Sequence, residues 1–242
     1  MTENVPIPLP HRAQGYAFLH GEGLEIGAFE CPAQVPTGCR VRYFDVLSRV
    51  EAGRRFPEID IARLVEPDVL GDLDRDGLAA IPTRSLDFVI CNHVLEHVAN
   101  PIGVIGELFR VLRPGGHAVI AIPDKDYTFD RTREPTAWAH LLGDWERRVT
   151  ESDDSHYLDF LHHVAPHVFT EAWRNIGDEV ARARARREHA HVWTTATFRD
   201  LMERALPVLK VRAECRYEKG GAETQIEYFS VWRKRRRWWP WS

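Results

Sequence analysis

The sequence lacks any long uninterrupted run of apolar residues. No window approaches the roughly 18 consecutive apolar residues that a membrane-spanning helix needs. The N-terminal segment MTENVPIPLPHRAQGY has no apolar core of the kind found in signal peptides. We therefore expect a cytoplasmic protein with no membrane span.

Cysteine and net charge are also scarce. The four cysteines, Cys31, Cys39, Cys91 and Cys215, contain no C-x-x-C pair, which argues against a disulfide framework and against a zinc site built on thiolates. The 32 basic and 36 acidic residues leave a net charge of -4, so the chain as a whole does not attract nucleic acid or an anionic membrane. We expect no nucleic-acid partner.

What the sequence does contain is a clear strand, helix and strand pattern over residues 85–124. Short apolar runs at 86–91 and 117–122 are typical of strands buried on both faces of a parallel sheet. Between them, Asn100 before a proline is a suitable helix N-cap, and Pro-Gly-Gly at 114–116 predicts the end of the helix and a turn. Such crossover units bind ligands beyond the carboxyl ends of their strands.

Similar patterns predict a larger sheet. Apolar runs at 23–27, 40–46 and 64–70 predict three further strands, and 208–217 with 224–232 predicts a closing β-hairpin. Strands that alternate with helices indicate an α/β fold with a mainly parallel sheet.

The run NHVLEHV, followed by ELFRVLRPGG and a strand ending in Pro-Asp, resembles the second half of a class I S-adenosylmethionine (SAM)-dependent methyltransferase. This resemblance implies a Rossmann-like seven-stranded sheet with an antiparallel last strand. The following PDKDYTFDRTREPT resembles a branch of that family associated with polysaccharides or sugar-containing natural products.

The chain divides into five expected segments. Residues 125–195 stop alternating strand and helix and are too long for a simple connection, so we expect a mostly helical insertion that caps the acceptor. Its arginine-rich part, 178–190, is most simply a solvated helix face. The segments are an extended N-terminal arm (1–20), the SAM-binding core (21–124), the helical insertion (125–195), the end of the core (196–232) and a basic, tryptophan-rich tail (233–242). The tail could contact an anionic glycan, a membrane surface or another subunit, which leaves a homodimer open, or it could pack on the domain.

The resemblance assigns the cofactor, SAM with S-adenosylhomocysteine (SAH) as product, to residues at the strand ends. These are Glu25, Gly27, Ala28, Asp45, Asp72, Leu73, Asn92 and His93. Asp45 ends the second strand, where an acid can accept hydrogen bonds from ribose hydroxyls; a helix cap or turn is the alternative. In the family, the acid at Asp72 faces the adenine amino group. Residues 28–30 lack the glycines that a pyrophosphate site requires, which disfavours a dinucleotide.

Methyl transfer to a hydroxyl also needs a base. The segment SDDSHYLDFLHHVAPH (152–167) concentrates histidines beside acids, and surface positions are the alternative for each of them. We predict His162 or His163 as the base, with His156, His97 and Asp124 as reserves. The same cluster could instead bind a divalent cation such as Mg²⁺, and we assign no residue as a metal ligand.

We expect O-methylation of a hydroxyl of a sugar or short saccharide, with Tyr127, Trp138 and Trp193 on the acceptor side. Methylation of another small metabolite, such as a polyketide, quinone or amine, is the alternative. A non-catalytic SAM-fold partner protein is the alternative from another class.

Overall fold

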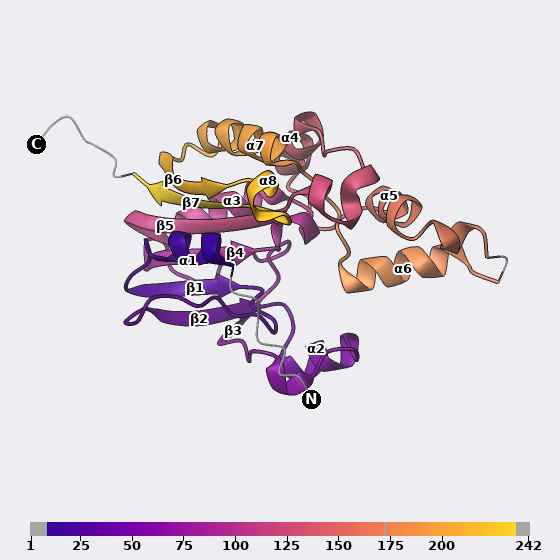
Figure 1. Cartoon of the computed structure of the whole chain (residues 1–242), viewed down its shortest axis with the longest axis horizontal. Helices are drawn as coiled ribbons and strands as arrows, with labels where there is room; N and C mark the ends of the chain where they lie inside the picture. Colours follow the sequence, from indigo (N-terminus) through magenta and orange to yellow (C-terminus); the bar gives the residue numbers. More distant parts are fainter. Residues whose placement is uncertain (1–8, 172, 236–242) are drawn as a thin grey trace, which may run out of the picture.

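The computed structural model describes residues 9–171 and 173–235. Its centre is a seven-stranded sheet in the order β3-β2-β1-β4-β5-β7-β6 (Figure 1). The strands are β1 (Glu22–Ile26), β2 (Arg40–Asp45), β3 (Val69–Leu70), β4 (Leu86–Asn92), β5 (Leu112–Pro123), β6 (Ala213–Lys219) and β7 (Glu227–Lys234). The first five run parallel, whereas β7 is antiparallel to both β5 and β6. The predicted sheet with an antiparallel last strand is confirmed.

Helices cover both faces of this sheet. The α-helices are α1 (Pro10–Tyr16), α2 (Arg49–Arg55), α3 (Pro101–Val111), α4 (Trp138–Arg147), α5 (Asp154–Val164), α6 (Ile176–Arg186), α7 (Thr195–Val208) and α8 (Gly221–Thr224). The 3₁₀ helices are η1 (Ile61–Arg63), η2 (Leu95–His97), η3 (Lys125–Tyr127), η4 (Phe129–Thr132) and η5 (Pro166–Phe169). Alternate residues of β4 enter two apolar cores, one with α3 and α7 and one with Tyr16 of α1. No helix in 9–171 or 173–235 is long and apolar enough to cross a membrane.

Helix α3 begins as its sequence predicts and ends earlier. The Gly103 N–H donates to Asn100 Oδ1 at 2.8 Å, which caps the helix. The helix ends at Val111, and the Pro-Gly-Gly run that follows lies inside β5, where the pairing with β4 shifts register. The prediction of a turn there is wrong, because Leu112 already pairs with Leu86.

The N-terminal arm is helical where the structure describes it. Residues 1–8 lie outside the described residues, and 10–16 form α1. The expectation of an extended segment is wrong for these residues. Pro10 occupies the first turn of the helix, where a backbone N–H would have no acceptor within the helix, so a proline is tolerated. Of the expected tail, residues 236–242 also lie outside the described residues.

The insertion over 125–195 is mostly helical. It contains η3, η4, α4, α5, η5 and α6, and α5 and α6 project beyond the sheet at the right of Figure 1. These two helices share a small apolar core of their own that includes Tyr157, Phe160 and Val180. Helix α4 instead packs on the main core through Leu141.

Candidate functional site

A cavity of about 1270 Å³ lies at the carboxyl ends of β1, β2 and β4. In this sheet β1 pairs with β2 on one side and with β4 on the other, so the strand order reverses there. Ligands bind α/β sheets at such reversal points. Of the cofactor residues predicted from the sequence, those that line the cavity are Glu25, Gly27, Ala28, Asp45, Leu73, Asn92 and His93.

Gly27 turns the chain at the end of β1. Its φ of 66° lies in the left-handed region, and a Cβ at this position would meet the Val94 side chain at 2.9 Å. A side chain here would therefore be strained and would crowd the cavity, so glycine is required.

Glu25, two residues earlier, ties down the loop after β1. Both carboxylate oxygens accept from the Ala33 N–H at 3.0 Å, and the side chain is buried. Burial raises the pKa of Glu25 to about 7, although the bond from Ala33 lowers it.

Asp45 ends β2 at the cavity wall. Its Oδ1 accepts from the Val46 N–H at 2.7 Å and from the Leu47 N–H at 3.2 Å. Burial raises the pKa of Asp45 against the lowering effect of these bonds. Because both bonds use Oδ1, Oδ2 remains available to a ligand.

Asp72 is not among the cavity-lining residues. Its Oδ2 accepts from Arg187 Nη2 at 2.5 Å, and Arg187 itself lines the cavity with Arg186. The prediction that the arginine-rich segment is only a solvated face is wrong for these two residues. No local pattern could have revealed this, because the contact joins positions 115 residues apart.

A charged network includes two cavity-lining residues, Arg12 and His93. Glu227, at the start of β7, is 0% exposed and accepts from Arg12 Nε at 2.8 Å. His11 Nε2 lies 2.7 Å and His93 Nε2 2.6 Å from the same carboxylate. Burial alone would raise the pKa of Glu227, but the hydrogen bonds from Arg12, His11 and His93 hold it well below its usual range. Sequence reasoning missed Arg12 and Glu227, because the ends of the described chain meet only in the folded sheet.

Beside this network, Asn92 connects β4 to α1. Its Nδ2 donates to the Tyr16 hydroxyl at 2.9 Å, and both residues line the cavity. Helix α1 therefore forms part of the cavity wall.

His97, named as a reserve base, lines the cavity from η2. Its Nδ1 lies 2.5 Å from the Arg187 carbonyl oxygen. A carbonyl can only accept, so Nδ1 carries the proton and Nε2 presents a free lone pair. Burial lowers the pKa of His97 in spite of the neighbouring Glu96 carboxylate, whose Oε1 lies 3.8 Å from Nε2. The ring is thus held as a neutral proton acceptor.

The other candidate bases lie elsewhere, and none is among the cavity-lining residues. His162 is exposed and stacks on Phe169, and His163 is exposed beside Thr132. His156 contacts another histidine of the insertion. Asp124 is buried and accepts from the Thr195 N–H and hydroxyl, which makes it a link between β5 and α7.

The aromatic residues expected on the acceptor side are likewise absent from the cavity lining. Trp193 is buried in the main core, and Trp138 packs against that core. Tyr127 is exposed on the surface.

Comparison with known proteins identifies the family. A family model described as a methyltransferase domain matches residues 18–205. The chain belongs to this methyltransferase family. The match spans β1 to β5, the insertion and most of α7, and it agrees with the class I resemblance of the sequence.

Curated relatives match the chain over a shorter stretch. Ubiquinone biosynthesis O-methyltransferases of Xanthomonas oryzae pv. oryzae and Xanthomonas campestris pv. campestris are 34% and 31% identical to it over 86 residues. These residues make up 36% of this chain and 34% of each relative. The chain thus spans about a third of the length of the curated relatives it matches.

Solved structures resemble the chain over most of its length. A possible histamine N-methyltransferase from Thermotoga maritima is 16% identical, covers 94% of this chain and 89% of its own, and has a TM-score of 0.48. A SAM-dependent methyltransferase from Aquifex aeolicus is 11% identical, with coverages of 90% and 86% and a TM-score of 0.45. At these identities and scores, the likeness carries no information about the reaction.

Proposed function

We propose that this protein transfers the methyl group of SAM to a hydroxyl oxygen of a small molecule and releases SAH. The observation that carries the proposal is the cavity at the strand-order reversal, which gathers seven of the eight cofactor positions inferred from the family resemblance. The family match supports the same reaction class.

Each part of the cofactor has a proposed partner. Asp45 would accept hydrogen bonds from the ribose hydroxyls through its free Oδ2. The methionine end would lie over Gly27 and beside Asn92, where the absence of a Cβ leaves room. The adenine would lie by Leu73, and Asp72, held by Arg187, would fix the wall around it.

His97 is the proposed base. Methyl transfer is an in-line displacement, so the protein must align the acceptor oxygen and take its proton as the oxygen attacks. The Nε2 lone pair of His97 would accept this proton. The nearby Glu96 carboxylate, which is 1% exposed, would stabilise the imidazolium that forms. His93 is less suitable, since its Nε2 is already bonded to Glu227.

The acceptor is proposed from two sources. The PDKDYTFDRTREPT resemblance favours a hydroxyl of a sugar or short saccharide. A phenolic or quinol hydroxyl is the second candidate, because the curated relatives are named for ubiquinone biosynthesis. Turnover of a panel containing both classes, with SAH formation as the readout, distinguishes them.

Calorimetry with SAH tests cofactor binding. We expect SAH to bind, and Asp45→Ala to weaken binding by about 1 to 3 kcal/mol, because the ribose hydroxyls lose their acceptor. The control is Asp200→Ala, which removes an exposed carboxylate on α7. Equal SAH affinity in Asp45→Ala and the wild type would refute the ribose assignment, and binding of NADH without SAH would refute the function.

Turnover at saturating SAM tests the base. His97→Gln should reduce turnover by about 10²-fold or more while SAH affinity is retained. His162→Gln and His163→Gln serve as matched comparisons on the exposed face of α5. If one of those two variants loses turnover and His97→Gln does not, the base lies in the insertion. Binding of SAH with no turnover of any acceptor would favour a non-catalytic partner protein.

A further inference from the structure

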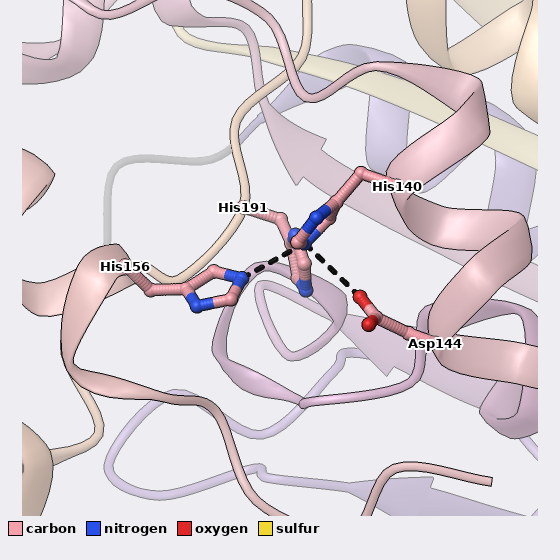
Figure 2. A group of neighbouring side chains, drawn as sticks. All are labelled: His140, Asp144, His156 and His191. Carbon is pink, nitrogen blue, oxygen red and sulfur yellow. Dashed lines mark hydrogen bonds and ion pairs between the residues drawn. The ribbon is translucent and has the colours of Figure 1, made fainter. Parts of the chain in front are cut away.

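Four side chains of the insertion converge outside the cofactor cavity. His140 and Asp144 come from α4, His156 from α5, and His191 from the segment that follows α6 (Figure 2). One nitrogen or carboxylate oxygen from each lies within 4.8 Å of the corresponding atom of all the others. Three imidazoles and a carboxylate therefore face one point.

The spacing of these atoms is that of a ligand set. His140 and Asp144 are one helical turn apart on α4, and His140 Nε2 lies 3.0 Å from Asp144 Oδ2. His140 Nε2 also lies 2.9 Å from His156 Nε2. Ligand atoms bound at 2.0–2.2 Å around a tetrahedral ion are roughly 3.3 Å apart, so small side-chain rotations would complete the geometry.

His191 has no other role for its ring nitrogens. Its side chain is fully buried, and neither nitrogen has a hydrogen-bond partner in the part of the chain that the structure describes. Its ring centre lies 5.2 Å from that of His156 and 5.7 Å from that of His140. A buried imidazole without partners is costly to keep, and a bound ion at the point these rings share would satisfy it.

We propose that His140, Asp144, His156 and His191 bind a divalent transition-metal ion of the zinc type. Imidazole ligands favour zinc over magnesium, which prefers six oxygen ligands. The cation considered from the sequence was placed in the cluster at 152–167, which supplies only His156 to this site, and none of the four proposed ligands lines the cavity.

Neighbouring groups hold the proposed ligands in place. Asp153 Oδ1 lies 3.0 Å from His156 Nδ1, which directs His156 Nε2 toward the shared point. Arg147 Nη2 donates to the other oxygen of Asp144 at 2.7 Å. Such partners outside the ligand shell orient metal ligands and tune their basicity.

Four protein ligands close a tetrahedral site, which is the arrangement of structural rather than catalytic zinc. The ion would join α4, α5 and the segment that leads into α7. Its role is to fasten the insertion, whose α5 and α6 otherwise project from the sheet with their own small core.

A second group, Glu96, His97 and His189, is also compact. Its histidines have protein partners, since His97 Nδ1 lies against the Arg187 carbonyl and His189 Nδ1 lies 2.6 Å from Asp130 Oδ2. Only His97 of this group lines the cavity, and we propose no metal at the group.

Metal analysis of the tag-free protein, purified after zinc supplementation and desalting, tests the proposal. We expect about one zinc per chain. His156→Ala and His140→Ala should each weaken zinc binding more than about tenfold in competition with a chromogenic chelator. Cobalt loaded in place of zinc should give the strong visible absorption of a tetrahedral site, and His156→Ala should lose it.

The matched control is His162→Ala, which removes an exposed histidine from the same helix, α5. It should retain the metal and the cobalt spectrum. Circular dichroism checks that His156→Ala is folded. Because His156 is partly exposed, its substitution should disturb the fold less than His191→Ala would. A wild-type protein that neither contains nor takes up zinc or cobalt would overturn the proposal, as would equal loss of metal in His162→Ala and His156→Ala. SAH affinity is a separate measurement, so failure here leaves the proposed reaction untouched.

Discussion

Burial acts in opposite directions on the acidic and basic side chains around the cavity. It raises the pKa of Glu25 to about 7 and lowers the pKa of His97. Both groups are thereby kept closer to neutral at physiological pH, where an ionised side chain would be costly to bury. Each shift gives a pH dependence that can be measured.

Glu25 should make the free protein less stable as pH rises. Its pKa in the folded state is raised above the ordinary value of about 4.3, so the cost of ionising it is absent at low pH and complete above about pH 7. The wild type should lose up to about 3 kcal/mol of unfolding free energy between about pH 5 and pH 8 because of this residue, and Glu25→Gln should not show this loss. Urea unfolding at several pH values checks it. Parallel stability curves for the wild type and the variant would contradict the prediction.

His97 should set the acidic limit of turnover. Its pKa is lowered below the ordinary value of about 6.5, so the neutral ring persists to more acidic pH, and turnover should fall only below that value. The pH profile of kcat/KM with saturating SAM measures this. In His97→Gln the residual rate should no longer follow this acidic limb, and an unchanged limb would assign it to another group.

Single residues of the proposed cofactor site were predictable where they follow strands. Gly27 and Asp45 lie at the carboxyl ends of β1 and β2. In a parallel sheet these ends lie at the same edge, where ligands bind. Arg187 and Glu227 were not predictable from the sequence. Arg187 reaches the cavity, and Glu227 reaches its lining residues Arg12 and His93, from elements far away in the chain. Arg187 comes from the insertion, and Glu227 comes from an antiparallel strand whose neighbours the sequence does not specify.

Among the secondary-structure elements, α1 depends on β7 for its position. Arg12 and His11 of α1 both bond to Glu227 of β7, and α1 packs its Tyr16 on Phe229. With only seven residues, α1 is too short to be stable alone. The extended arm expected from its prolines is replaced by a helix because tertiary contacts hold it.

Glu227→Gln should therefore loosen α1. Removing the carboxylate leaves Arg12 largely buried without its partner, which should cost about 3 kcal/mol of unfolding free energy. The pKa of Glu227 is lowered in the folded state, so its contribution is present above about pH 4.3 and declines as pH falls further. The wild type should lose stability in acid more steeply than the variant. Chemical unfolding at neutral and acidic pH measures both, with the exposed Glu203→Gln as control.

For the whole molecule, cofactor binding should stabilise the fold. The cavity draws residues from α1, the strand ends and the segment after α6, so SAH would connect all three. At a concentration 100 times its dissociation constant, SAH should raise the unfolding free energy by about 2.7 kcal/mol. Thermal unfolding with and without SAH measures this. NADH at the same concentration should leave the unfolding temperature unchanged, and stabilisation by NADH alone would contradict the proposal.

The insertion shows where whole-molecule prediction from sequence fails. Its length and helical content were predictable, because seventy residues without alternation cannot be a simple loop. The role of its histidines was not, since the grouping of His140, His156 and His191 depends on how three segments fold together. Helical spacing alone pairs Asp159 with His163, and that pair lies 3.6 Å apart on the exposed face of α5.

The position of β7 between β5 and β6 also determines when, during synthesis, the chain can first bind its ligand. Arg12 and Glu227 are 215 residues apart in the chain, so α1 leaves the ribosome long before the carboxylate that anchors it has been synthesised. Strand β6 must likewise wait for the neighbour that joins it to β5. Ribosome-bound chains stalled before residue 227 should therefore fail to bind immobilised SAH, whereas chains in which β7 has emerged should bind it.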